Sequence, residues 1–369
     1  MIDKPQFVGK KVRLGDIVKI EKASMPSGNN VWVLNLDAVE KGTGKVIVKN
    51  RMKADSAGTS TVAFTADAVL YSKLRPNLNK VVVADEPGLA TSEMLPLIVN
   101  PEVLDRRYFA YLLRSNSFVN LAVSSTAGSK MPRMNKKTLL NAVFPIPSLE
   151  LQHQRIDLLS SIEKARTKAE LLIQQLDTLV KSRFVEMFGT PDNNIHSLPI
   201  KTMGEISEQL IAGGDKPRKI SKNKDLKHPY PVFANGTIAD GLQGFSEEAR
   251  VNKSAVTIAA RGTIGFCLVR EPGFTPVVRL ISLVPKPSIN VVYLKYFIDL
   301  LNLAGSGSSQ AQLTLPAFRE QQILVPELKE QLEFSTFVAQ VDKSRFVAQQ
   351  QIEKLQMLYD SLAQEYFGD

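Results

Sequence analysis

The sequence predicts an α+β protein that contains the same kind of unit twice: two globular domains of mixed β-sheet with helices, separated by two long antiparallel helices that form a coiled coil. The first observation is the stretch 149–189, which has no helix breaker before Gly189 and places its apolar residues at helical spacing. The second is that this stretch returns at the end of the chain after a shift of 179 positions, without a gap. The third is that β-branched and aromatic residues dominate the segments between the helices. Together they indicate a pseudo-twofold internal repeat.

The repeat divides the chain into four segments. A solenoid repeat has a period of roughly 20–50 residues, so this much longer period indicates a duplicated domain-plus-helix unit. We expect a first domain at 1–148, a first long helix at 149–189, a second domain at 190–325 and a second long helix at 326–369. The matching positions are Pro147, Leu149, Gln152, Lys164, Ile173, Leu176, Leu179, Ser182, Glu186, Phe188 and Gly189, which fall on Pro326, Leu328, Gln331, Lys343, Ile352, Leu355, Leu358, Ser361, Glu365, Phe367 and Gly368.

The elements of the first domain follow from local patterns. A lead-in over residues 1–20 ends in alternating apolar positions, and residues 31–99 predict several strands separated by Gly, Asn, Asp and Pro turns. Residues 101–121 predict a helix that starts at Asn100 or Pro101. A small polar loop, a short helical turn and a strand that ends in two prolines then lead into the long helix.

The second domain repeats this plan. KTMGEISEQL parallels KVRLGDIVKI, and NVVYLKYFIDLL parallels RRYFAYLL as a helix. The polar loops also correspond, with Gly128 and Ser129 falling on Gly307 and Ser308. The β-rich middles, 25–98 and 210–285, do not match each other convincingly. The flanking segments of the two domains therefore repeat, while the β-rich middles between them diverge.

The net charge of +9 is unevenly distributed. The segment 1–148 carries +9 and 190–325 carries +4, whereas 149–189 is neutral and 326–369 carries −4. This separation favours a polyanion as the partner of the globular domains and another protein as the partner of the helices. A mild basic surplus is also common among soluble proteins, so the charge alone leaves nucleic-acid binding as one of two interpretations.

The long helices are expected to act as a rod. About 38 residues at 1.5 Å each give roughly 57 Å, and an antiparallel pair would hold the two domains at opposite ends. The alternative is that each amphipathic helix merely closes the core of its own domain. A second apolar stripe on the first helix comprises Ile173, Val180 and Met187. The heptad pattern comprises Ile162, Ala165, Ala169, Leu172, Leu176 and Leu179, with equivalents Val341, Ser344, Ala348, Gln351, Leu355 and Leu358.

The residues provide no catalytic or metal-binding constellation. His153, His196 and His228 stand outside any HExxH motif and are expected to be solvated. Cys267, the single cysteine, lies in an apolar strand and predicts a core thiol. The ARGTIG stretch (260–265) lacks the GK[ST] of a phosphate-binding loop, and no glycine-rich dinucleotide fingerprint or Asn-Pro-Pro-aromatic tetrapeptide occurs. We expect a non-catalytic chain with no metal and no cofactor of its own.

The compartment is predicted from the same composition. One cysteine permits no internal disulfide and no zinc finger, which fits a reducing cytoplasm. No run approaches about 18 apolar residues and no apolar leader begins the chain, so neither export nor membrane insertion is expected.

Seven phrases of the chain carry a resemblance to a known family. They are VLYSKLRPNLNKVVVAD (69–85), RYFAYLLRS (107–115), NKKTLLNAVFPIPSLELQHQRI (135–156), KSRFVEMFG (181–189), YPVFANGTIADGL (230–242), ARGTIGFCLV (260–269) and LVPELKEQ (324–331). With them the chain resembles the specificity (S) subunits of type I restriction–modification enzymes. What makes the resemblance specific is the order of target domain, long helix, target domain and long helix over essentially the whole chain. The first long helix begins LELQHQ, whereas the family's commoner Glu-Gln pair is kept as Glu330-Gln331 in the second.

The resemblance implies a function and a set of partners. Each target-recognition domain would read one half of a bipartite sequence in double-stranded DNA, and the helix pair would set the spacing and dock two modification (methyltransferase) subunits. Restriction subunits would join through the complex, and S-adenosylmethionine, ATP and Mg would belong to the partners. The host would be a bacterium or an archaeon, with no membrane involved. The stripe Ile173, Val180 and Met187 is the expected docking face.

Basic and amide side chains near the polar loops are the expected DNA contacts, since Arg and Lys read guanine, Asn and Gln read adenine, and phosphates take cations. Two other functions stay open: a stand-alone DNA-modifying or DNA-cleaving enzyme, and a protein-interaction scaffold that does not bind DNA. The expected contacts are Lys73, Arg75, Lys130, Arg133, Lys136 and Lys137 in the first domain and Lys216, Arg218, Lys219, Lys222, Asn235 and Arg261 in the second.

Overall fold

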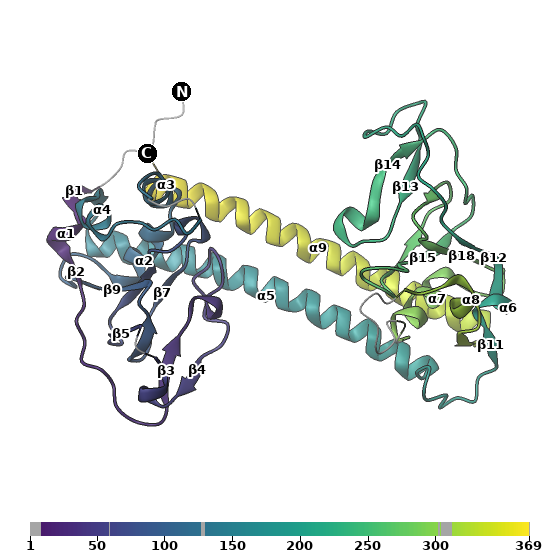
Figure 1. The fold of residues 1–369 in the computed structure, drawn as a ribbon, viewed down its shortest axis with the longest axis horizontal. Coiled ribbons are helices and arrows are strands. Elements are labelled where there is room, and N and C mark those ends of the chain that lie inside the picture. Colours follow the sequence, from purple (N-terminus) through teal and green to yellow (C-terminus); the bar gives the residue numbers. More distant parts are fainter. Residues whose placement is uncertain (1–8, 59, 127–129, 302, 304–311, 369) are drawn as a thin grey trace. The chain divides into compact units, whose positions relative to one another are not determined.

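A computed structural model describes residues 9–58, 60–126, 130–301, 303 and 312–368. The described residues fall into two compact units, and each long helix contributes to both (Figure 1). Unit 1 contains the described residues of Met1–Ala169 with those of Gln350–Asp369, and unit 2 contains Glu170–Gln349. The polar-loop match of Gly128 and Ser129 with Gly307 and Ser308 lies outside the described residues.

The first domain alternates short strands and short helices before it enters the long helix α5. Its elements are β1 (Lys10–Arg13), α1 (Leu14–Ile17), β2 (Val18–Ile20), β3 (Val31–Leu34), η1 (Leu36–Ala38), β4 (Asn50–Met52), η2 (Ala54–Ser56), β5 (Thr61–Phe64), β6 (Val69–Ser72), η3 (Pro76–Leu78), β7 (Val81–Val83), β8 (Gly88–Thr91), β9 (Met94–Val99), α2 (Arg106–Arg114), α3 (Asn116–Ser124), α4 (Lys136–Asn141), β10 (Val143–Ile146) and α5 (Leu149–Phe188).

Two sheets and a strand pair make up this domain. One antiparallel sheet has the order β2-β9-β6-β7, and a mixed sheet has the order β4-β3-β8-β5. The alternating residues Val69 and Tyr71 of β6 turn inward and pack under α2, because side chains two apart share one face of a strand. Trp32 and Phe64 meet edge to face, with ring centroids 5.2 Å apart, in the core of the mixed sheet.

The helix expected at 101–121 is in fact two helices and starts later. Asp105 is the N-cap of α2, with its carboxylate accepting from the backbone N–H of Arg107 at 2.7 Å and of Tyr108 at 3.3 Å. Ser115 then interrupts the helix with an extended backbone and becomes the N-cap of α3, because its hydroxyl oxygen accepts from the N–H of Phe118. Hydrophobic periodicity runs through such a break, and only the capping serine marks it.

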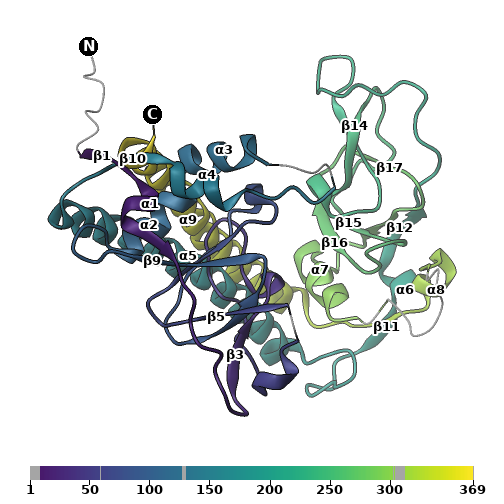
Figure 2. The same cartoon turned by 60° about the vertical axis from the view of Figure 1, so that its left-hand side comes forward.

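The second domain repeats one four-stranded sheet of the first, although the β-rich middles of the two domains do not match in sequence. Its antiparallel sheet is β12-β18-β15-β16, the counterpart of β2-β9-β6-β7, and α7 lies against β15 and β16 (Figure 2). A second sheet has the order β14-β13-β17. The elements are β11 (Ile200–Thr202), α6 (Met203–Ile206), β12 (Ser207–Ala212), β13 (Tyr230–Phe233), η4 (Ile238–Gly241), β14 (Leu242–Ser246), β15 (Ala255–Ile258), β16 (Cys267–Arg270), β17 (Thr275–Pro276), β18 (Ile281–Pro285), α7 (Val291–Asp299), α8 (Leu315–Arg319), β19 (Gln322–Leu324) and α9 (Leu328–Phe367).

The helices α5 and α9 lie side by side and antiparallel within each unit (Figure 1). In unit 1 the start of α5 meets the end of α9, with the guanidinium of Arg155 stacked 4.5 Å from the ring centroid of Tyr366. In unit 2 the end of α5 meets the start of α9, with the rings of Phe184 and Phe334 5.2 Å apart. These contacts confirm the predicted packing of the two long helices.

The long helices also complete the domain cores. Phe367, next to the end of the chain, packs on Tyr108 of the first domain at 5.2 Å between ring centroids. Phe188, its counterpart in the repeat, packs on Tyr293 of the second domain at 4.9 Å. Each domain is therefore closed by the beginning of the long helix that follows it and by the end of the other one. The core-closing helix, posed as an alternative to the rod, is therefore present in each unit.

Candidate nucleic-acid interface

A buried glutamine fixes the first domain to its long helix. Gln152 lies in the first turn of α5, and its amide donates to the carbonyls of Val103 at 2.8 Å and Pro147 at 2.9 Å. Its side-chain oxygen accepts from the N–H of Asp105 at 2.8 Å. Because Asp105 caps α2, this one side chain sets the orientation of α2 relative to α5.

Gln331 repeats this arrangement in the second domain. Its amide donates to Ser288 at 3.2 Å and Pro326 at 2.9 Å, and its oxygen accepts from the N–H of Asn290 at 2.7 Å. Asn290 is the N-cap of α7. The sequence repeat aligned the two glutamines, but it gave no indication that they join the domains to the long helices. The available signal was the recurrence of Pro and Gln five positions apart at the start of both helices.

In the first domain, the turn after β6 lies against the loop before α4. The N–H of Arg75 donates to the carbonyl of Pro132 at 2.8 Å, and the N–H of Met134 donates to Lys73 at 2.9 Å. The structure thus brings together two stretches that the sequence separates by about sixty residues. Arg75 is exposed at a positive φ of 49°. Among the described residues its guanidinium has no hydrogen-bond or ion-pair partner, so it is available to a ligand.

Arg133 is in a different situation. Its guanidinium donates hydrogen bonds to the carboxylate of Glu93, from Nη2 to Oε1 at 2.8 Å and from Nε to Oε1 at 3.0 Å. These hydrogen bonds hold the pKa of Glu93 below its ordinary value. The pair ties the loop before α4 to the turn between β8 and β9, so Arg133 orders the surface. Lys130, Lys136 and Lys137 are exposed, the last two in the first turn of α4.

In the second domain, the basic residues between β12 and β13 all lie on the surface. Lys216, Arg218, Lys219 and Lys222 are exposed, and none of them has an ion pair with a described residue. The segment continues with further exposed lysines towards β13. The positive potential of this surface therefore has no internal carboxylate to neutralise it at these four positions, which suits contacts to phosphate.

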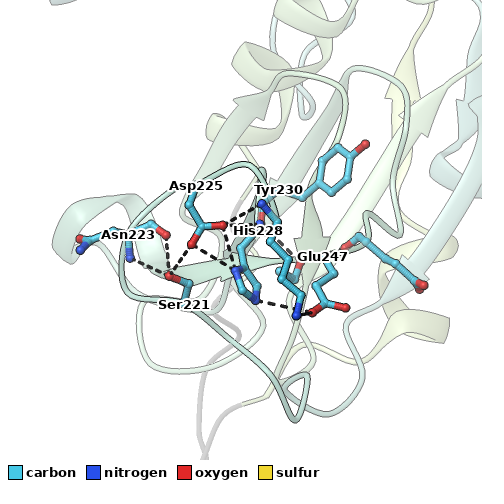
Figure 3. Close-up of polar contacts among 9 residues, drawn as sticks. Ser221, Asn223, Asp225, His228, Tyr230 and Glu247 are labelled. Atoms are coloured by element: carbon cyan, nitrogen blue, oxygen red, sulfur yellow. Dashed lines mark hydrogen bonds and ion pairs between the residues drawn. The ribbon is translucent and has the colours of Figure 1, made fainter.

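A compact polar network holds the end of this segment in place (Figure 3). The carboxylate of Asp225 accepts from the backbone N–H of His228 at 2.7 Å and lies 3.0 Å from its Nδ1. The backbone hydrogen bond from His228 holds the pKa of Asp225 below its ordinary value. On the other side of the ring, Nε2 lies 3.7 Å from Oε1 of Glu247. His228 was expected to be solvated, but it is half-buried between two carboxylates and anchors the loop.

Asn235 and Arg261 lie on neighbouring turns of the same domain. The amide of Asn235 donates to the carbonyl of Val278 at 2.6 Å, and its oxygen accepts from the N–H of Ala260 at 2.8 Å. Both ends of the side chain are thereby occupied by backbone, so Asn235 positions turns. Arg261 is exposed, with Nη2 donating to Gln312 at 2.9 Å.

The long helices follow the expected stripes only in part. Val180 is 1% exposed and belongs to the core of unit 2, whereas Leu172 and Leu179 are 43% and 49% exposed. The expected docking stripe is therefore wrong for Val180, because a buried side chain cannot meet a partner. Ile173, Leu176 and Met187 are half-buried beside it. Ile162, Ala169, Val341 and Ala348 are buried, Leu355 is half-buried and Leu358 is exposed.

Two arginines also lie between the long helices. Four residues after Ile162, Arg166 donates to Gln356 at 2.5 Å in unit 1. Its counterpart Arg345 donates to Asp177 at 2.5 Å in unit 2. A search for apolar residues at heptad spacing skips these positions and so shifts the seam onto Leu172 and Leu179. The sequence signal that was missed is that both arginines, and the positions of their partners, are related by the same 179-residue shift.

The remaining candidates for chemistry are inert. Cys267 is a buried thiol, as expected, and its Sγ donates to Asp299 at 3.0 Å. Burial, reinforced by this carboxylate, raises the pKa of the thiol. It lines a cavity of about 620 Å³ together with Lys295 and Tyr296. No group of three or more His, Cys, Asp or Glu that could hold a metal occurs among the described residues, and none of their helices is long and apolar enough to cross a membrane.

Fold and surface together define a class of protein: a duplicated scaffold with basic turns on two domains that share a pair of helices. The family model for the type I restriction modification DNA specificity domain matches residues 9–176 and 199–357. The chain belongs to this family.

Individual relatives agree with this assignment. A Mycoplasma pneumoniae (strain ATCC 29342 / M129) protein named as type I specificity subunit S.MpnORF507P is 30% identical over 229 residues. That alignment covers 62% of this chain and 61% of the relative, so the match spans about three fifths of the relative's length.

Solved structures share the fold. The S subunit of a type I restriction–modification system from M. genitalium has a TM-score of 0.62 at 18% identity, covering 100% of this chain and 98% of that one. A chain from a structure of complex assembly in a type I R-M system has a TM-score of 0.66 at 17% identity, covering 99% of this chain and 98% of that one. At this identity the likeness is one of fold, and it confirms the α+β architecture with two long packed helices.

Proposed function

We propose that this chain is the non-catalytic DNA specificity subunit of a type I restriction–modification complex. Each domain reads one half of a bipartite target in double-stranded DNA, and two methyltransferase subunits bind the helix pair. Restriction subunits join through that complex. The observation that carries the proposal is the duplication itself: two domains that share the order of one four-stranded sheet, each anchored through a buried glutamine, bear different exposed cations. Such a scaffold suits two unrelated half-sites.

The proposed phosphate and base contacts are the exposed cations together with Lys73, which is half-buried. Lys73 and Arg75 form one group with Lys130, Lys136 and Lys137, and the second group consists of Lys216, Arg218, Lys219, Lys222 and Arg261. Arg133 and Asn235 act on DNA indirectly, by holding their turns in place. Each true phosphate contact contributes about −0.9 to the slope of log affinity against log salt. Replacing one of Lys216, Arg218 or Lys219 by Ala should therefore make the slope shallower by about one.

Methylation mapping of DNA modified by the assembled complex tests the proposal. We expect two short methylated words separated by unread base pairs of fixed number. A single uninterrupted word would contradict the two-domain reading. Turnover of S-adenosylmethionine or cleavage of DNA by the isolated chain would establish a stand-alone enzyme. Salt-insensitive, sequence-blind behaviour towards DNA would leave only a protein scaffold.

The role of the helices in spacing has its own test. Seven extra residues placed after Ala169 and seven after Ala348 keep the helical phase to within about 20° and lengthen both helices by about 10 Å. At 3.4 Å per base pair this corresponds to about three base pairs. The two methylated words should move apart by about that number while their sequences stay the same. An unchanged separation would show that the helices do not set it.

A further inference from the structure

Three turns of the second domain are tied together at one place. They are the turn 236–241 after β13, the turn Val278–Arg279 between β17 and β18, and the beginning of the turn between β15 and β16 at Ala260. Asn235 joins them, because it precedes the first turn and makes side-chain hydrogen bonds to the carbonyl of Val278 and the N–H of Ala260. We call these segments the turn cluster.

The backbone of the turn cluster is strained. Ala239, Asp240, Val278 and Arg279 have φ values of 46°, 54°, 52° and 62°, in the left-handed region. They are four of the seven non-glycine residues of the described chain with positive φ. A β-branched residue such as Val278 is especially disfavoured there. Such strain persists only where the surroundings impose it, and it concentrates at functional sites.

Backbone hydrogen bonds impose the strained conformation on the turn Val278–Arg279. The N–H groups of Val278 and Arg279 donate to the carbonyls of Gly214 and Gly213, both at 2.8 Å. Gly213 must be glycine, because a Cβ there would lie 2.6 Å from the backbone of Pro276. These bonds also join the turn cluster to the start of the basic segment that carries Lys216.

The buried side chain of Arg270 supports the turn 236–241, the other strained part of the turn cluster. Arg270 donates to the carbonyl of Asp240 at 2.5 Å and to the hydroxyl of Thr257 at 3.0 Å. Its guanidinium also stacks 3.7 Å from the ring centroid of Phe233. Burial lowers the pKa of Arg270 to about 10, which leaves it charged at neutral pH. The turn 236–241 is thus a rigid platform.

The turn cluster exposes two apolar side chains and one cation. Ile238 is 89% exposed and Val278 is 49% exposed. Beside them Arg279 is exposed, and its guanidinium has no hydrogen bond or ion pair within the described part of the chain. Val278 keeps a left-handed backbone although its side chain faces solvent, so side-chain packing does not account for the strain. A rigid edge with two apolar tips and a free guanidinium matches the major groove, where a thymine methyl and the guanine O6/N7 pair are exposed.

We propose that the turn cluster is the base-reading edge of the second domain, with Ile238 against the 5-methyl group of a thymine and Arg279 on a guanine in the major groove. This inference rests on the proposed function and adds the chemistry that the second half-site must contain. The cations of the neighbouring basic segment then hold phosphates and set the register. Asn235 and Arg270 are positioning residues, because they touch turns and not DNA.

The test uses the chain assembled with its modification subunits and the duplex found by methylation mapping. Each thymine of the second half-site is replaced in turn by deoxyuridine, which removes only the 5-methyl group, and affinity is measured by fluorescence anisotropy at one salt concentration. We expect one position at which the replacement, by removing one buried methyl group, weakens wild-type binding about fourfold. The variant Ile238→Ala should bind the unmodified duplex about tenfold more weakly and lose its sensitivity to deoxyuridine at that position.

Arg279 is tested in parallel with 7-deazaguanine, which removes the N7 acceptor. One guanine should be sensitive in the wild type and insensitive in Arg279→Ala, and the methylated word should become degenerate at that position only. Ile200→Ala, at an exposed isoleucine of β11, is the matched control and should change nothing. Because Ile238 and Arg279 are exposed, thermal unfolding of both variants should match the wild type.

The outcomes separate this inference from the proposed function. A wild-type complex that binds no bipartite sequence would refute the proposed function. A complex that binds one, but is indifferent to deoxyuridine throughout the second half-site and to Ile238→Ala, would overturn the turn cluster as the reading edge while leaving that function intact. A kinked duplex whose binding does not respond to deoxyuridine would also overturn the turn cluster as the reading edge. That result would indicate an isoleucine wedge in the minor groove, which makes no contact with the methyl group.

Discussion

Gln152 and Gln331 make the same three hydrogen bonds in the two halves of the protein. Each donates to the carbonyl of the proline five residues earlier and to a carbonyl just before a domain helix, and each accepts from the N–H of that helix's N-cap residue. The N-caps, Asp105 and Asn290, are 185 positions apart, whereas the glutamines are 179 apart. The linkage is therefore the same although the glutamine follows the N-cap residue by 47 positions in the first half and by 41 in the second.

Replacing Gln152 by Leu should destabilise unit 1. The change leaves one N–H and two carbonyls without partners in a buried place, and each unsatisfied group costs about 1–3 kcal/mol. We expect the free energy of unfolding to fall by about 3 kcal/mol or more, and amide exchange at the start of α2 to accelerate. Gln154→Leu, on the exposed side of the same turn, is the control. Equal effects of the two changes would contradict the assigned role.

The last turn of the chain should stabilise the first domain. Phe367 is buried against Tyr108, and its carbonyl accepts from the hydroxyl of Ser117 at 2.6 Å. Phe367→Ala should cost about 3–5 kcal/mol and make the first domain, but not the second, sensitive to limited proteolysis. Phe346→Ala, at an exposed site of the same helix, should be neutral. Cleavage that appeared first in the second domain would argue against this packing.

Leu179 and Val180 are adjacent in sequence but face different surroundings. Leu179→Lys should leave unfolding unchanged and abolish co-purification with the modification subunits, because the side chain is exposed on the outer face of α5. Val180→Lys should unfold unit 2, because it places a charge in the core. Thermal unfolding and pull-down measure the two effects. Normal assembly of the Leu179→Lys chain would remove this face as the docking surface.

Cys267 should report on the unfolding of unit 2. Its buried thiol has a raised pKa, so a thiol reagent at pH 8 should label it slowly in the folded chain and rapidly in urea. Because the folded-state pKa lies above the unfolded one, the associated stability is present below about pH 9 and is lost as pH rises beyond it. The urea midpoint of unit 2 should therefore drop between pH 7 and pH 10, and less so in Cys267→Ala. Rapid labelling of the folded chain would be inconsistent with the buried position.

The candidate site was only partly predictable. Exposed cations such as Arg75 and Lys216 could be named, because charge next to Gly- and Pro-rich turns is visible in a sequence. Their partners could not be named, because the Arg133–Glu93 pair and the two hydrogen bonds of Asn235 join residues about 25 to 43 positions apart. Ile238 and Arg279 were missed, since nothing local distinguishes an isoleucine on a strained turn from one in a strand.

By itself the sequence determined the duplicated plan: a 179-residue repeat, two helices with apolar periodicity, two basic β-rich domains, and a lone thiol in an apolar strand. Those properties follow from spacing and composition, which act locally. Only the tertiary structure decided which stripe of α5 is buried, that Arg166 and Arg345 occupy the seam, that Phe367 closes the domain at the other end of the chain, and where the strained turns meet. Each of these depends on contacts between distant residues, whose packing and hydrogen bonds outweigh the local pattern.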